Sequence, residues 1–120
     1  MNGNVRSVIE VMKDNLNRKL SLAEMCRSAD LSISRLSHLF RKEVGESPAQ
    51  YLIMLKMERA RSLLCDPVQS VKAVMVEVGF RDQSNFARAF KKAYGETPSE
   101  YRAKKTDSAS VPSSGKLIGK

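Results

Sequence analysis

Side chains that could take part in chemistry gather on one side of segment 35–42. Hydroxyl, imidazole and basic groups recur there at helical spacing, as Arg35, Ser37, His38, Arg41 and Lys42. Such groups donate hydrogen bonds, and the basic ones carry positive charge, so they suit binding to an anion or to the polar edge of a ligand. A second polar-faced segment follows at 83–92. The chemistry that these residues offer is recognition.

A catalytic or metal centre is not predicted. His38 is the only histidine, which excludes a site of several histidines. The sequence shows no Ser/His/Asp set, paired carboxylates or phosphate-cradling glycine loop. Cys26 and Cys65 are interpreted as small core residues, and the glycines are explained as turns or helix caps at Gly45, Gly79 and Gly95. We therefore predict no enzyme activity, no cofactor and no metal.

The composition favours a compact chain with a polyanionic partner. Its 120 residues are 42% apolar, enough for one domain or two small units that share an element. The formal net charge of +8 attracts phosphate groups. From charge alone, however, a basic surface that is merely solvated is as good an interpretation as a surface that binds nucleic acid. The longest apolar runs, 51–55 and 73–76, are too short to span a bilayer, and the cysteine usage favours a reducing cytosol.

The elements that must position the polar side chains are repeated within the chain. Segment 40–51, FRKEVGESPAQY, returns as segment 90–101, FKKAYGETPSEY, with six of the twelve positions identical. A period near fifty in so short a chain indicates one supersecondary unit that is used twice.

Apolar residues at three- and four-residue steps predict a first helix over about 5–16. Ser21 and Glu24 then form the capping box of a short second helix. Asp30 follows, and because Asp tolerates a left-handed backbone, the chain is expected to turn there.

The third helix is expected to start after Ser32 or Ser34 and to end at Gly45. Its apolar side is formed by Leu36, Leu39, Phe40 and Val44. A helix, a tight turn and a polar-faced helix make the helix-turn-helix pattern.

Ser47 and Pro48 open a long helix to Leu64, a rod of about 25 Å that joins the two units. The second unit repeats the pattern with one extra residue in its turn, within 81–83, and Thr97 caps a final short helix. The expected all-α organisation is a first unit at 1–47, a linker helix at 48–66, a second unit at 67–103 and a disordered tail at 104–120.

These residues resemble the DNA-binding domain of the AraC/XylS family of bacterial transcription regulators. The match is most specific in 78–92, VGFRDQSNFARAFKK, and in 95–102, GETPSEYR, and it covers about 5–102. The resemblance implies seven helices in two homeodomain-like helix-turn-helix units with a rigid linker helix. Met75 departs from the small Ala usual at that helix contact, and its extra volume is expected to cost about 1 to 3 kcal/mol unless neighbours repack.

The resemblance also implies roles for the polar side chains. Residues early in each second helix meet base edges in the major groove, where Gln and Asn match adenine and Arg binds guanine through two hydrogen bonds. The implied base contacts are Ser34, Arg35, Ser37 and His38 in the first unit, and Gln83, Ser84, Asn85 and Arg88 in the second. The implied phosphate contacts are Arg41, Lys42, Ser47, Lys91, Lys92 and Thr97.

The function implied is sequence-specific binding of double-stranded DNA by one module of a cytoplasmic transcription regulator, most often an activator. RNA polymerase is the further partner that the resemblance implies. The module itself is expected to be monomeric, with any dimerisation through a separate domain of the full-length protein. The alternative from a different class is a basic helical adaptor that binds a protein partner.

Overall fold

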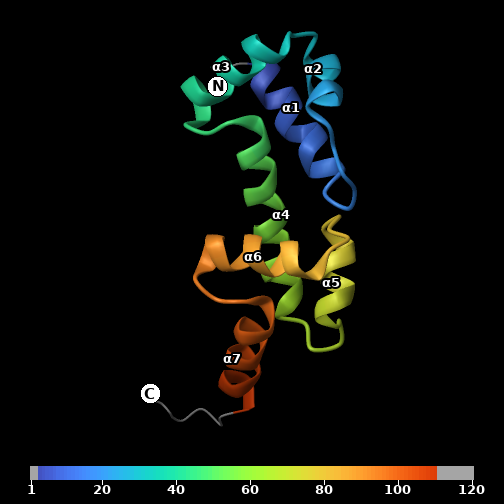
Figure 1. Cartoon of the computed structure of the whole chain (residues 1–120), viewed down its shortest axis with the longest axis vertical. Coiled ribbons are helices and arrows are strands. Elements are labelled where there is room, and N and C mark those ends of the chain that lie inside the picture. Colours follow the sequence, from blue (N-terminus) through green and yellow to red (C-terminus); the bar gives the residue numbers. More distant parts are fainter. Residues whose placement is uncertain (1–2, 111–120) are drawn as a thin grey trace.

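The structure of the chain, a computed structural model, describes residues 3–110, with side chains up to residue 104. Its regular elements are all helices, which confirms the predicted all-α class. In chain order they are α1 (Gly3–Asp14), α2 (Leu22–Ala29), α3 (Ile33–Val44), α4 (Pro48–Leu64), α5 (Val71–Glu77), α6 (Gln83–Tyr94) and α7 (Pro98–Ser110) (Figure 1).

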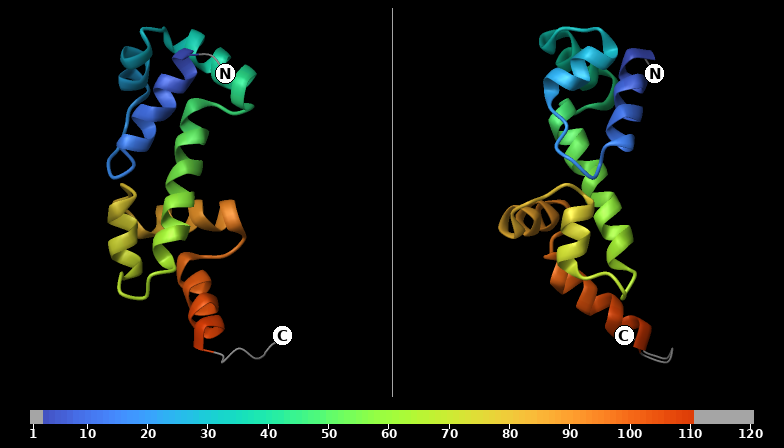
Figure 2. Two further views of the ribbon diagram at one scale, coloured as in Figure 1. Left: turned by 180° about the vertical axis from the view of Figure 1, so that it is seen from behind. Right: turned by 90° about the vertical axis from the view of Figure 1, so that its right-hand side faces the viewer.

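The molecule is elongated, with principal extents of 53 × 27 × 20 Å. Helices α1–α3 form one unit and α5–α7 the other, and α4 runs lengthwise through both (Figure 1). Figure 2 shows from two further sides that the units are stacked along the long axis. The 17 residues of α4 are those predicted for the linker helix.

Each unit has its own apolar core, and α4 contributes to both. Leu52 and Leu55 of α4 join the buried residues of α1–α3, among them Val8, Met12, Leu36 and Phe40. Met57, Ala60 and Leu64 join the second core with Val74, Met75, Val78, Phe86 and Phe90. Met75 is only 5% exposed, so its larger side chain lies inside the second core.

The helix starts follow the predicted caps. Ser21 and Glu24 exchange both hydrogen bonds of a capping box, and Thr97 and Glu100 do the same at α7. Of the two serines considered for α3, the cap is Ser32, whose hydroxyl accepts from the Arg35 amide at 3.2 Å. Ser47 caps α4 as predicted, Ser70 caps α5, and α6 is capped by Asp82, for which the sequence analysis predicted no cap.

The two helix-turn-helix turns differ by the one residue that the sequence predicts. Asp30 adopts the left-handed backbone with φ 55°, and Gly79 takes its place in the second unit with φ 79°. The next amide closes the same bond in each turn, Leu31 to the Cys26 carbonyl and Phe80 to the Met75 carbonyl, both at 3.0 Å. The extra residue therefore lies between Phe80 and the cap of α6.

The structure differs from the expectations at the C-terminal side. Helix α7 continues to Ser110, whereas a tail was expected from residue 104; the remainder of that tail, 111–120, lies outside the described residues. Residues 103–110, AKKTDSAS, include no large apolar side chain, so apolar periodicity could not predict this extension. Cys26 is buried as predicted, but Cys65 is exposed because it follows the last buried turn of α4.

Arg102 of α7 ties the second unit to the end of α4. Its guanidinium donates to the carbonyls of Leu64 at 3.4 Å and Asp66 at 3.1 Å. The Leu64 carbonyl is in the last turn of α4, where helix acceptors lack an internal partner, and the Asp66 carbonyl also accepts from the Gln69 amide at 3.3 Å. Arg102 therefore links α7 to the end of α4.

Gly79 is the glycine whose surroundings exclude a side chain. A Cβ atom there would stand 2.8 Å from the Lys56 Nζ, 3.0 Å from the Arg18 nitrogen and 3.1 Å from the Arg18 carbonyl oxygen. Gly95 has a similar φ of 82°, but a Cβ there would meet nothing within 4 Å. The two positions therefore share backbone strain and differ in crowding.

We expect Gly95→Ala to destabilise the chain by about 1 to 2 kcal/mol, the strain of a left-handed alanine. Gly79→Ala should cost about 1 to 3 kcal/mol more, because crowding against the Arg18 backbone adds to the same strain. Urea unfolding of both variants measures the difference. Equal losses would show that the approach of Arg18 to Gly79 is not tight in solution.

The loop before α2 is held by an ion pair. Arg18 Nη2 stands 2.6 Å from Glu24 Oε2, and this guanidinium, with the Ser21 amide, lowers the pKa of Glu24 to about 2. Because the pKa is lower in the folded than in the unfolded chain, the stabilisation is present above the ordinary value of 4.5 and is lost as the pH falls toward 2.

Glu24→Gln should therefore lower the melting temperature at pH 7 and have a much smaller effect at pH 2.5. The amide keeps the shape of the side chain but lacks the charge that responds to pH. Melting curves of both proteins between pH 7 and pH 2.5 test this, and a difference that stays constant with pH would contradict it.

Candidate nucleic-acid interface

Helices α3 and α6 each place an apolar side inward and a polar side outward. Their buried sides carry Leu36, Leu39 and Phe40 in α3, and Phe86 and Phe90 in α6. The exposed residues predicted for recognition are Ser34, Arg35, His38, Arg41 and Lys42 in α3, and Gln83, Ser84, Asn85, Arg88, Lys91 and Lys92 in α6. Ser37 is half-buried, as is its counterpart Ala87, so it is the least accessible of the predicted set.

Aromatic packing fixes the rotation of α6 about its own axis. The Phe90 ring lies 4.9 Å from Tyr94 and 5.7 Å from Tyr101 in edge-on contacts, and Phe86 lies 5.6 Å from Phe80. The first unit has one corresponding pair in the described residues, Phe40 and Tyr51 at 5.8 Å. Since rings interlock in preferred geometries, the outward face of α6 is held firmly.

Arg88 and Asn85 are hydrogen-bonded to each other on this outward face. The Arg88 guanidinium donates to the Asn85 side-chain oxygen at 3.3 Å, one helical turn apart. The Asp82 carboxylate accepts from the Ser84 and Asn85 amides at 2.8 and 3.4 Å, which fixes the first turn of the helix. Two side chains that match different bases are thus oriented together.

Lys91 and Lys92 follow Arg88 by three and four residues, so both are its neighbours on the surface of α6. Lys92 lines a groove between α4 and α6 together with Arg61, Glu46 and Glu58. Arg61 stands 4.6 Å above the Tyr94 ring, a cation–π contact that holds it at this groove.

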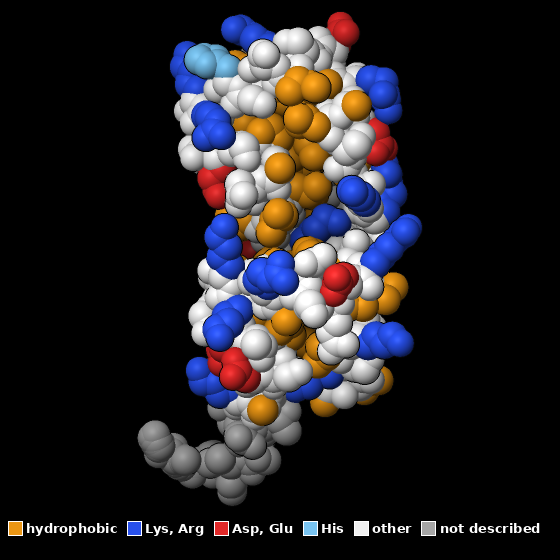
Figure 3. Space-filling view, in the orientation of Figure 1, with side chains coloured by type: hydrophobic (Ala, Val, Ile, Leu, Met, Phe, Trp, Pro, Cys, Tyr) orange, Lys and Arg blue, Asp and Glu red, His pale blue; other side chains and the backbone are white. Residues whose placement is uncertain are grey.

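Ser47 and Thr97 use their hydroxyls as caps, accepting from the Gln50 and Glu100 amides at 3.2 Å each. An anion at either helix start would therefore meet backbone amides rather than these hydroxyls. Lysine and arginine side chains are spread over the face seen in Figure 3, with fewer acidic ones between them.

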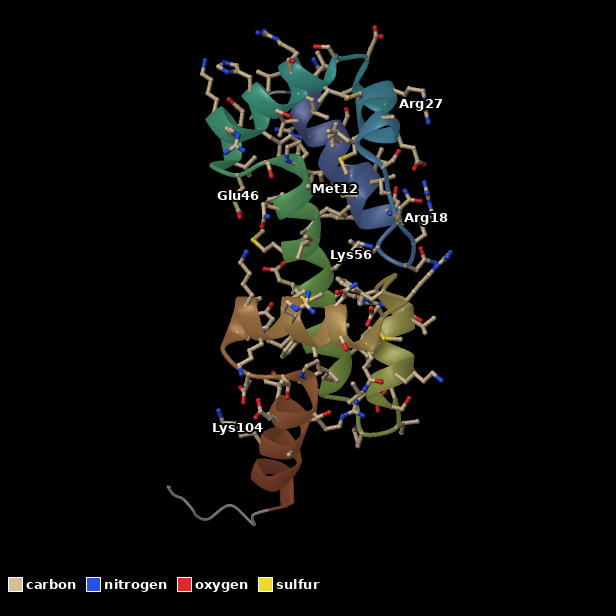
Figure 4. The ribbon with its side chains drawn as sticks, viewed as in Figure 1. Met12, Arg18, Arg27, Glu46, Lys56 and Lys104 are labelled. Carbon is tan, nitrogen blue, oxygen red and sulfur yellow. The ribbon has the colours of Figure 1, made fainter. Side chains whose placement is uncertain are left out.

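Lys56 is a buried charged residue that the sequence analysis did not identify. It is buried within α4, and its ammonium donates to the carbonyls of Leu16, Arg18 and Val78 at 3.3, 2.8 and 3.2 Å. Figure 4 shows it directed from α4 toward the loop that carries Arg18. Burial lowers the pKa of Lys56. The available signal was its place in the buried row Leu52, Lys56, Ala60 at four-residue steps.

No group of three or more His, Cys, Asp or Glu residues among those that the structure describes is arranged to hold a metal ion. None of the helices described is long and apolar enough to cross a membrane.

Two helix-turn-helix units on one shared helix define a class of DNA-binding proteins. A profile of the helix-turn-helix domain family of the AraC type matches residues 25–104. The chain therefore belongs to the AraC/XylS family of transcription regulators, as its DNA-binding domain.

Characterised relatives support the assignment. The chain is 36% identical over 104 residues to the arabinose operon regulatory protein of Escherichia coli, covering 86% of this chain and 36% of that protein. It is 32% identical over 102 residues to the XylDLEGF operon transcriptional activator of Pseudomonas putida, covering 82% of this chain and 32% of that protein. The chain thus spans about a third of the length of these relatives.

Solved structures share the fold. The DNA-binding domain of AdpA, a global transcriptional factor in complex with a target DNA, matches with a TM-score of 0.82 and 25% identity, covering 94% of this chain and all of that one. A DNA-binding transcriptional dual regulator from Escherichia coli K-12 matches with a TM-score of 0.79 and 29% identity, covering 89% of this chain and 96% of that one.

Arg88→Ala should weaken binding to the preferred DNA site by about 1 to 3 kcal/mol and relax the preference at one base pair, since the contact expected of Arg88 is to a base. The matched control is Lys91→Ala, which should weaken all sequences alike and reduce the salt slope by about one, as a phosphate contact does. Titrations against the preferred site and its single-base variants at several salt concentrations separate the two. If Lys91→Ala alone changed base preference, the assignment of the face would be wrong.

Proposed function

We propose that this chain reads two successive major-groove segments of double-stranded DNA with α3 and α6, as the DNA-binding module of a bacterial transcription activator. The observation that carries the proposal is the pair of polar outward helices held on one linker helix. Family membership and the DNA complex of the AdpA domain support it.

The dimensions suit this mode of binding. Major-groove segments on one side of DNA are about 34 Å apart, one helical turn. The chain is 53 Å long, and α4 separates the two units along that length. Where the separation of α3 and α6 differs from one helical turn, bending of the DNA makes up the difference.

The two units contribute unequally to base recognition. The outward face of α6 carries Gln83, Asn85 and Arg88, whose side chains match the hydrogen-bonding edges of adenine and guanine. The corresponding face of α3 carries Ser34, Arg35 and His38, of which two are short or weakly donating. We assign the larger share of polar base contacts to the second unit, and phosphate contacts to the basic residues later in both helices.

The family is one of regulatory DNA-binding proteins and not a class of enzymes. For the full-length protein we propose RNA polymerase as a partner and the bacterial cytoplasm as the location. Self-association, where it occurs, is assigned to a part of the protein other than this module.

The chain should select an asymmetric DNA site and bind it as a monomer, because both reading units are in one polypeptide and their outward residues differ. Its affinity should fall about a thousandfold or more between 50 and 200 mM salt, given on the order of 6 to 10 phosphate contacts. Selection from random DNA, followed by titration and by mass measurement of the complex, tests both points.

A strictly palindromic site occupied by two chains would contradict the monomeric mode. Absence of any selected sequence, together with weak dependence on salt, would favour the alternative of an adaptor for a protein partner.

A further inference from the structure

Lys56 connects the two units directly. Leu16 and Arg18 lie in the loop between α1 and α2, whereas Val78 follows the last turn of α5. One ammonium group, carried by the helix common to both units, therefore donates to backbone carbonyls of each.

The chemistry of the contact suits an ammonium. Its three N–H donors meet three carbonyl oxygens, and it has no acceptor to leave unpaired. Val78 is the residue that ends α5, so its carbonyl lies at the partly negative end of that helix. The Lys56 side chain is only 6% exposed, so water does not replace these bonds while the units remain in contact.

An ion pair holds the loop between α1 and α2 that supplies two of these carbonyls. The Arg18 guanidinium in this loop stands 2.6 Å from the Glu24 carboxylate. Gly79 meanwhile approaches the Arg18 backbone so closely that a Cβ atom would stand about 3 Å from it. Backbone of the first unit thus packs on backbone of the second, with the Lys56 ammonium at the junction.

The packing on α4 makes this junction important for orientation. Leu52 and Leu55 anchor the first unit, and Met57, Ala60 and Leu64 anchor the second, on neighbouring turns of one helix. Apolar contacts of this kind are non-directional. The hydrogen bonds of Lys56 are directional, and they relate the loop before α2 to the turn before α6.

We propose that Lys56 is a positioning residue that sets the orientation of α3 relative to α6, and thereby the spacing of DNA half-sites that the chain accepts. The proposal rests on the two-groove mode of binding given above. Without the junction, each unit still folds on α4 and reads its own half-site, but the pair occupies the relative orientation needed for simultaneous binding only part of the time.

The test compares Lys56→Met with the unsubstituted chain on three kinds of DNA. These are the selected site, each half-site alone, and the selected site with one base pair inserted or removed between its halves. Methionine keeps the buried stem and removes all three donors. The matched control is Lys13→Met, which removes the same charge from an exposed position on α1.

Lys56→Met should bind the selected site about tenfold or more weakly, because affinity falls with the fraction of molecules in the competent orientation. Its affinity for each half-site should match that of Lys13→Met within about twofold, since the units are intact. The penalty for a one-base-pair change, which rotates one half-site by about 35° relative to the other, should shrink at least about threefold.

Gly79→Ala provides a second route to the same contact, since it crowds the junction without removing the charge. It should also reduce the spacing penalty, whereas Gly95→Ala, with a similar φ and open surroundings, should not.

An unchanged spacing penalty in Lys56→Met would overturn the proposal. Equal losses on the selected site and on both half-sites would also overturn it, because Lys56 would then support folding alone. If the unsubstituted chain discriminates no spacing at all, the two-groove mode itself fails, and that result is seen before any variant is measured.

Discussion

Neither helix-turn-helix unit can bury an apolar core without α4, and the rest of the structure follows from this constraint. Three short helices enclose too little apolar surface to be stable alone. The middle of α4 is consequently apolar on several sides, with Leu55, Met57 and Ala60 buried within six residues. A helix that is needed by two cores at once cannot leave either of them. The separation of the two reading helices is thereby limited by the length of one continuous helix.

The same constraint explains where charge is found in the molecule. With both cores drawn onto α4, the outer sides of α3 and α6 are left for solvent or a ligand, and basic and amide side chains occupy them. Lys56 is the exception, a charged residue in the apolar row of α4. Burial of an ammonium is costly unless its donors are satisfied. Here the carbonyls of Leu16, Arg18 and Val78 accept its hydrogen bonds. The buried ammonium of Lys56 thus bonds to the protein's own backbone, whereas the polar side chains on α3 and α6 are available to solvent or a ligand.

The helix starts and the two turns could be predicted from the sequence because they depend on residues that are close together in the chain. The caps at Ser21, Ser47 and Thr97 use side chains that bond to amides a few residues away, and the extra residue in the second turn follows from aligning the repeats. The partners of Lys56 could not be predicted, since they lie 22 to 40 residues away and are backbone atoms without a residue signature. The continuation of α7 to Ser110 and the position of Lys92 at a groove could not be predicted either, because apolar periodicity reports neither of them.

Because its two units differ in sequence, this chain can be oriented on DNA in a way that a symmetric dimer cannot. A complex in which the α1 end and the α7 end are chemically different cannot be turned around on its DNA without exchanging the two half-sites. In the proposed mode of binding, each bound molecule therefore has a direction along the double helix. Upstream and downstream become distinguishable at the level of a single small protein, and inverting its site would present the opposite end of the molecule to whatever is bound next to it.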